Sequence, residues 1–129
     1  MKHILAVLLA SVAIAAGTEV LAHHSFAAEF DASKAVRVSG TLTKVEWTNP
    51  HIYFYLDVKD AKGKVTEYAF SSGPPGTLRR AGIKKTDFKI GETVTVTGAP
   101  AKDGTKHLGW LKMIKYPDGR VFVYRDGSE

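Results

Sequence analysis

The stretch His51–Lys59 reads HIYFYLDVK, and its residues alternate between two chemical kinds. One set is apolar and consists of Ile52, Phe54, Leu56 and Val58. The residues between them include the aromatic pair Tyr53 and Tyr55, together with a histidine and charged side chains. Because successive side chains of a strand point to opposite faces of the sheet, this period of two predicts a strand whose apolar set faces a core.

The segment before it, Ala35–Trp47, is rich in β-branched residues and is expected to form a long first strand. Its apolar residues occupy two opposite phases, with Val36, Val38 and Leu42 in one and Val45 and Trp47 in the other. Such a change of phase predicts a bulge or a sharp bend, which we expect after Gly40. Pro50 ends the segment, because it has no N–H to donate and restrains Asn49.

The rest of the chain alternates turn signals with further strands. The expected elements are strands at 64–71, 92–98, 106–116 and 120–124, and a short helix at 77–81 that Gly82 stops. A helix between the third and fourth strands favours a barrel over an immunoglobulin-like sandwich, which has about seven strands. The sequence therefore predicts an all-β fold with one short helix, a small OB-like Greek-key barrel of five to six strands.

The N-terminal segment 1–22 is typical of a secretory signal peptide. Ile4–Ala16 is an unbroken apolar run of 13 residues, and Val20-Leu21-Ala22 supplies the small residues of a cleavage site. An uncleaved anchor is the alternative, but the run is short of the roughly 20 residues that a membrane span needs. We expect cleavage after Ala22, export to the periplasm or secretion, and one domain over 23–129 whose residues 23–34 form a leader.

Composition restricts the kinds of site and partner. The chain has no cysteine, which excludes disulfides, thiolate nucleophiles and cysteine-based zinc sites. Its net charge of +5 is ordinary for a soluble domain, but it also suits an anionic glycan, lipid surface or protein. We expect no nucleic-acid partner in an exported protein and no transmembrane segment in the mature chain.

Signal cleavage would itself create a candidate metal site. The mature chain would start with His23 and His24, and an N-terminal histidine offers its α-amine and its ring Nδ1 close together. The ordinary pKa of that amine is about 7.7–8.0, so a metal ion displaces a loosely held proton. A further histidine would complete a nitrogen-rich site of the kind that Cu(II) prefers.

His51 is the favoured additional ligand, with His24 assisting and His107 less favoured. His51 follows the stiff Asn49-Pro50 pair and starts a strand, so its backbone would be rigid and its ring well positioned. The alternative is structural: the leader lacks fixed contacts, and His51 caps a turn or packs against Trp47.

Two other features could bind a ligand without a metal. Tyr53 and Tyr55, with Trp47, could form a stacking platform, unless the helix or Phe26 and Phe30 of the leader cover them. A cluster of cations could attract an anionic surface, or could simply be a solvated helix face. Its members are Arg79, Arg80, Lys84, Lys85 and Lys89, with Asp87 among them.

Support for an enzyme in the sequence is thin. Nucleotide-binding glycine motifs and the G-x-S-x-G nucleophile motif are absent, and Glu29 and Asp31 are a weak basis for acid–base work. We therefore expect a binding module that holds or delivers copper. The alternative is a metal-free module for an anionic glycan, lipid surface or protein partner.

Three motifs together resemble a known family. They are His23-His24-Ser25-Phe26, Glu29-Phe30-Asp31 and Trp47-Thr48-Asn49-Pro50-His51. This combination is similar to a family of small exported bacterial proteins of unknown function, whose members carry an HHSF leader and an N-P-H turn. The resemblance covers nearly all of 23–119, and it implies export and a small β-barrel but no established activity.

Overall fold

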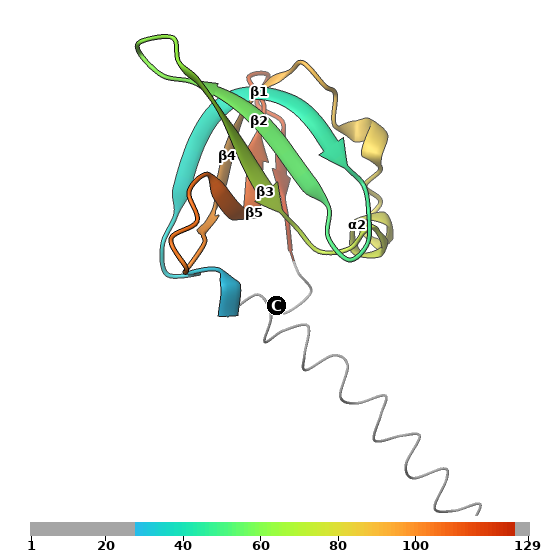
Figure 1. Ribbon diagram of the computed structural model, residues 1–129. Helices are drawn as coiled ribbons and strands as arrows, with labels where there is room; N and C mark the ends of the chain where they lie inside the picture. The colour runs from blue at the N-terminus through green and yellow to red at the C-terminus, as the bar shows by residue number, and fades with distance from the viewer. Residues whose placement is uncertain (1–27, 126–129) are drawn as a thin grey trace, which may run out of the picture.

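The computed structural model describes residues 28–125, and these form a barrel of antiparallel and parallel strands. The strands are β1 (Val36–Glu46), β2 (Tyr53–Lys59), β3 (Val65–Ser71), β4 (Thr93–Pro100), β5 (Leu108–Lys115) and β6 (Val121–Val123). They follow the order β3-β2-β1-β4-β5-β6, and a parallel pairing of β3 with β5 closes the barrel (Figure 1). This order confirms the expected OB-like barrel.

The strand β2 has the orientation that its alternation predicts. Ile52, Phe54 and Leu56 are completely buried, whereas Tyr53 and Tyr55 keep partial exposure on the outer face. The strand itself begins at Tyr53, two residues later than expected. His51 and Ile52 instead pair with the loop that follows β3, as described below.

The change of phase in β1 is present, and it lies after Gly40 as predicted. The pairing with β2 shifts between Leu42 and Lys44, so the bulge lies beyond Gly40. Gly40 serves another purpose: a Cβ at this position would lie 2.4 Å from the carbonyl oxygen of Asp57. The glycine therefore permits a close approach of two backbones, while the bulge turns Val45 into the core.

One end of the barrel is covered by the segment between β3 and β4. This segment contains the helix α2 (Pro75–Arg80) and the 3-10 turn η1 (Lys85–Asp87), and Gly82 follows α2 with a φ of 79°. Leu78 and Phe88 project from it into the core, where the Phe88 ring packs edge-on against Phe54 at 4.9 Å. Figure 1 shows α2 on one side of the barrel and the β4–β5 loop on the other.

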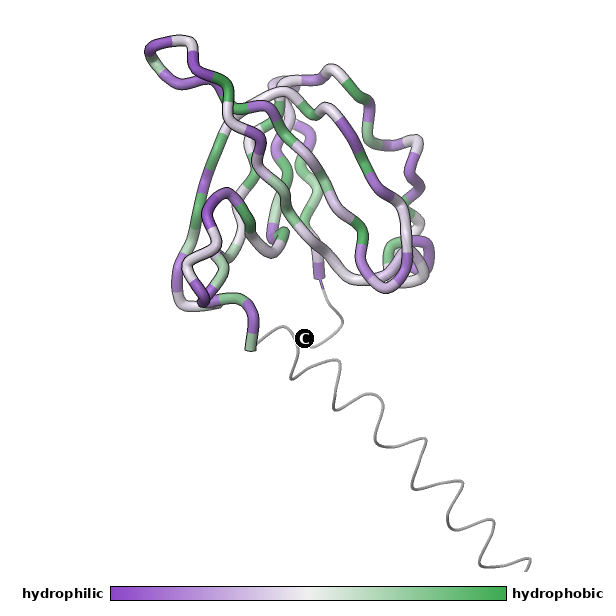
Figure 2. Tube along the Cα trace, in the orientation of Figure 1, coloured by the Kyte–Doolittle hydropathy of each residue, from purple (hydrophilic) through white to green (hydrophobic). Residues whose placement is uncertain are grey.

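Polar residues concentrate in the connections. Figure 2 shows the projecting β2–β3 turn coloured mostly as hydrophilic, whereas hydrophobic colours recur along the strands. None of the helices within residues 28–125 has the length and apolar character to cross a bilayer. The expected signal peptide over 1–22 lies outside the described residues.

Candidate functional site

Residues that precede β2 and follow β3 meet at the end of the β2–β3 hairpin. The Ser72 amide donates to the Ile52 carbonyl at 2.9 Å, and the Ile52 amide donates to the Gly73 carbonyl at 3.3 Å. These bonds extend the hairpin beyond both strands. They also hold the backbone of Ser72 and Gly73 next to His51.

The His51 ring is oriented by this loop. Its Nδ1 lies 3.0 Å from the carbonyl oxygen of Ser72. A carbonyl oxygen only accepts, so Nδ1 carries the proton and the lone pair of the neutral ring is on Nε2. Histidines that ligate metals usually have their second ring nitrogen bonded to a carbonyl or carboxylate in this way. The geometry thus leaves Nε2 suited to bind a metal ion.

Trp110 links His51 to two further aromatic residues. The His51 ring meets the Trp110 ring edge-on at 5.9 Å, and Trp110 also contacts Phe30 at 5.7 Å and Tyr124 at 5.9 Å. The Tyr124 hydroxyl accepts a hydrogen bond from the Gly73 amide at 2.9 Å. We call this group the His51 site, and it comprises His51, Ser72, Gly73, Trp110, Tyr124 and Phe30.

The C-terminal end of the expected leader is anchored at the His51 site. Phe30 is buried and pairs with Ala101, and the Asp31 amide donates to the Pro100 carbonyl at 2.9 Å. Phe30 therefore packs against Trp110 and does not lie over the tyrosines of β2. The two leader histidines, His23 and His24, are outside the described residues.

The other histidine predicted as a weaker ligand is elsewhere. His107 lies in the β4–β5 loop, where its ring packs edge-on against Tyr68 at 4.6 Å. Residues 28–125 contain no group of three histidine or acidic side chains that could hold a metal. A metal at His51 would therefore need ligands from another part of the chain.

The tyrosine platform forms only in part. Tyr53 and Tyr55 lie side by side at 6.3 Å, but Trp47 packs against Phe88 and the core. The Tyr55 hydroxyl donates to Glu46 at 3.0 Å, and Lys44 lies over the Tyr55 ring. Burial and this carboxylate raise the pKa of Tyr55 above its ordinary value. One of the two rings is thus already engaged by charged neighbours.

The predicted cationic cluster is exposed. Arg79 and Arg80 end α2, where positive charge is favourable to the helix dipole. Lys84, Lys85 and Lys89 follow, and the Asp87 carboxylate accepts a hydrogen bond from the Lys84 amide at 2.8 Å. Both the anionic partner and the solvated face therefore stay predictions for this cluster.

The His51 site also contains residues that sequence reasoning did not select. Ser72 is completely buried, Trp110 is 8% exposed, and Tyr124 is half-buried. Ser72 and Tyr124 belong to no sequence motif, since one lies in a glycine-proline loop and the other near the end of the chain. A tryptophan on an apolar strand was the one available signal, since its N–H seeks a partner when buried.

Comparison with known proteins identifies a family but no function. The profile of a family of unknown function, DUF6152, matches residues 8–109. This agrees with the expected membership in an uncharacterised domain family, whereas the HHSF leader as a family feature stays a prediction. No curated protein and no solved structure matches the chain.

Proposed function

This chain belongs to DUF6152, a family of unknown function, and we propose that it is an exported copper-binding module in which His51 is a ligand. In this proposal the signal peptide over 1–22 is removed after Ala22. The module holds or delivers the metal and performs no reaction. The observation that carries the proposal is the 3.0 Å contact between His51 Nδ1 and the Ser72 carbonyl.

That contact supports a ligand role for a chemical reason. The backbone carbonyl of Ser72 fixes the tautomer and orients the ring, so less rotational freedom is lost when Nε2 binds a metal. Trp110 packs edge-on against the same ring and restricts it further.

The anchored end of the leader supports the participation of His23 and His24. Phe30 and His51 contact the same Trp110 ring, so the leader enters the fold beside the proposed ligand. His23 precedes Phe30 by seven residues, a length of chain that spans up to about 25 Å when extended. An N-terminal amine and imidazole on such a tether can reach His51.

The expected ligands favour copper over other metals. An amine and two or three imidazoles form a nitrogen-rich set, which suits Cu(II) better than calcium or magnesium, whose ligands are oxygens. The chain has no cysteine to compete for a softer ion. We therefore propose Cu(II) as the bound species.

The test is a Cu(II) titration of processed protein that begins at His23, compared with a His51→Asn variant. The asparagine amide can still donate to the Ser72 carbonyl, but it has no equivalent of Nε2. We expect the affinity for Cu(II) to fall by about 10-fold or more, while the unfolding midpoint changes little. The matched control is His107→Asn, which should bind copper like the wild type.

A second comparison tests the N-terminal chelate. Protein with one additional alanine before His23 keeps every side chain but moves the α-amine away from the imidazole. Loss of affinity in this protein supports the proposal, as does a nitrogen-rich Cu(II) signal in electron paramagnetic resonance. Unchanged affinity in both the extended protein and His51→Asn would overturn it. Mass spectrometry of protein from its native compartment would report the true N-terminus and any bound metal.

A further inference from the structure

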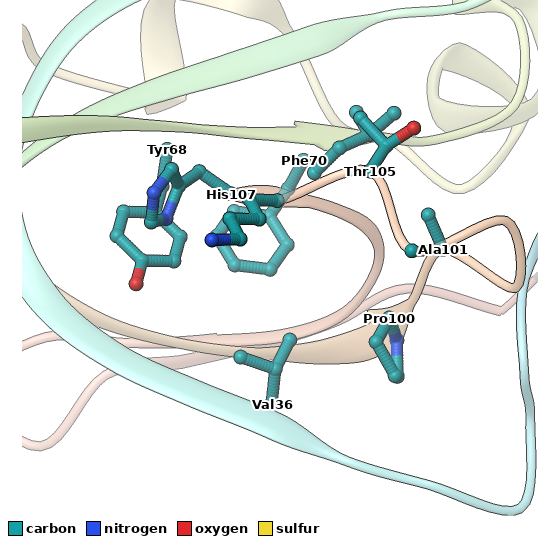
Figure 3. Close-up of a pocket in the computed structure, with 10 residues that line it drawn as sticks. Val36, Tyr68, Phe70, Pro100, Ala101, Thr105 and His107 are labelled. Carbon is teal, nitrogen blue, oxygen red and sulfur yellow. The ribbon is translucent and has the colours of Figure 1, made fainter.

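On the side of the barrel away from α2, next to the β4–β5 loop, lies a pocket of about 310 Å³. It lies between β3, the start of β1 and the β4–β5 loop. Figure 3 shows Tyr68, Phe70 and His107 on one side of it and Val36 and Pro100 on the other. None of these residues belongs to the His51 site.

The aromatic side of the pocket is held in place by the core. Tyr68 and Phe70 share the inward face of β3, and their rings are nearly parallel at 6.5 Å. Gly98 and Gly109 leave room for Phe70, because a Cβ on either glycine would lie 2.9 Å from its ring. Phe70 therefore forms a fixed base, and Tyr68 extends from it toward solvent as a flat apolar surface.

The β4–β5 loop supplies the polar rim. His107 has a φ of 60°, a left-handed conformation that is uncommon outside glycine, and its ring packs edge-on against Tyr68 at 4.6 Å. Lys106 and Thr105 precede it on the rim. Asp103 of the same loop does not line the pocket, and its carboxylate accepts a hydrogen bond from the Thr105 amide at 2.8 Å.

The charge of the pocket is positive. Lys106 is exposed, and within residues 28–125 it forms no ion pair. The lining includes no carboxylate. A ligand with a negative charge can therefore approach Lys106 without meeting an acidic residue in the pocket lining, since the Asp103 carboxylate is turned to the Thr105 amide, and the net charge of +5 favours its arrival.

We propose that this pocket binds a small planar aromatic carboxylate. The ring lies against Tyr68, which packs on the completely buried Phe70, and the carboxylate lies at Lys106. A volume near 310 Å³ is at the lower limit for ligand pockets, which suits a molecule of one or two fused rings. This binding requires no metal and does not depend on the copper proposal.

The test uses three probes with the same ring system and different charge: 2-naphthoate, 2-naphthalenemethanol and 2-naphthylmethylammonium. Each is titrated into metal-free protein and followed by amide shifts in nuclear magnetic resonance spectra. We expect 2-naphthoate to bind most tightly, with the largest shifts at Val36, Tyr68, Ala101 and 104–108. The order of affinity should be anion, neutral molecule, cation.

Four variants distinguish binding in the pocket from non-specific binding. Lys106→Gln should weaken 2-naphthoate binding about threefold, as expected for one exposed charge pair, whereas Lys62→Gln in the β2–β3 turn should leave it unchanged. Ala101→Leu should fill the pocket and weaken all three probes. The proposal is overturned if the cation binds as tightly as the anion, or if the shifts lie elsewhere. His51→Asn should retain the wild-type affinity for 2-naphthoate, so this result and the copper result are independent.

Discussion

The barrel contains two aromatic clusters, and their chemistry differs. Under α2, rings of Phe54, Phe88 and Phe122 pack edge-on against one another, with centroids 4.9 and 5.3 Å apart. At the His51 site, rings of Phe30, Trp110, His51 and Tyr124 pack at 5.7 to 5.9 Å. The first cluster is hydrocarbon, whereas the second contains polar atoms bonded to the Ser72 and Gly73 backbone.

This difference separates a stabilising role from a binding role. A hydrocarbon cluster is stabilised by burial and dispersion, which have no directional requirement beyond shape. In the second cluster, hydrogen bonds to a fixed loop set the direction in which a ring nitrogen or a hydroxyl points. The cluster under α2 should therefore be sensitive to volume, and the His51 site should be sensitive to single polar atoms.

The largest effect should come from the cluster under α2. Phe54 is completely buried, so Phe54→Ala removes a ring and leaves a cavity, and the free energy of unfolding should fall by about 3–5 kcal/mol. Chemical denaturation measures this change. The matched control is Val65→Ala on the exposed face of β3, which should change stability by less than about 0.5 kcal/mol. A midpoint that barely moves for Phe54→Ala would show that the cluster is not the main core.

A smaller loss is expected from Gly73→Ala at the His51 site. The added Cβ would lie 2.2 Å from the Tyr124 hydroxyl, so the tyrosine must move away from the loop. Overpacking of this kind costs about 1–3 kcal/mol, and near-ultraviolet circular dichroism should report the changed surroundings of Trp110. Gly76→Ala in α2 is the control, since its Cβ meets no atom closer than 3.4 Å and alanine favours a helix. Equal stability of the two variants would contradict the tight packing at Gly73.

Replacement of tyrosine by phenylalanine should change the free energy of unfolding in opposite directions at positions 124 and 116. Tyr124→Phe leaves the buried Gly73 amide without its acceptor and should lower the free energy of unfolding by about 1–2 kcal/mol. Tyr116→Phe removes a buried hydroxyl that has no partner within residues 28–125, and should raise stability by about 1 kcal/mol. Thermal and chemical unfolding of both variants measure the contrast. A loss in both would show that Tyr116 has a polar partner.

The smallest expected effect is a difference in the pH dependence of stability between the wild type and Tyr116→Phe. Burial, and secondarily the nearby Glu92, raise the pKa of Tyr116 above its ordinary value of 10.0. The folded state then holds this proton more tightly than the unfolded state, so stability should fall as pH rises above about 10. The Tyr116→Phe variant should lose less stability than wild type between pH 9 and 11. The same change in the free energy of unfolding with pH for both proteins would contradict the raised pKa of Tyr116.

Much of the barrel could be predicted because its signals are local. The alternation in β2 depends on side-chain direction alone, and it placed Phe54 and Leu56 correctly in the core. Gly82 has the positive φ expected where a helix stops. The change of phase in β1 predicted the bulge after Gly40, whereas the close approach of the Asp57 backbone to Gly40 was visible only in the structure.

The candidate sites depended on contacts between distant parts of the chain. Trp47 was grouped with the tyrosines of β2 because all three are aromatic and close in sequence. The bulge and the end of β1 instead direct Trp47 toward Phe88. Cover of the tyrosines by Phe30 was one of two alternatives left open, but pairing with Ala101 places Phe30 against Trp110. No local pattern encodes such pairings, since they arise only when the strands assemble.

The amino-acid sequence alone determined which face of β2 is buried, where the turns lie and that no thiol is available. It did so because alternation, glycine conformations and residue types are properties of short segments. Only the tertiary structure decided which nitrogen of His51 carries the proton. That choice follows from a carbonyl 21 residues further along the chain, brought within 3.0 Å by the closing of the β2–β3 hairpin.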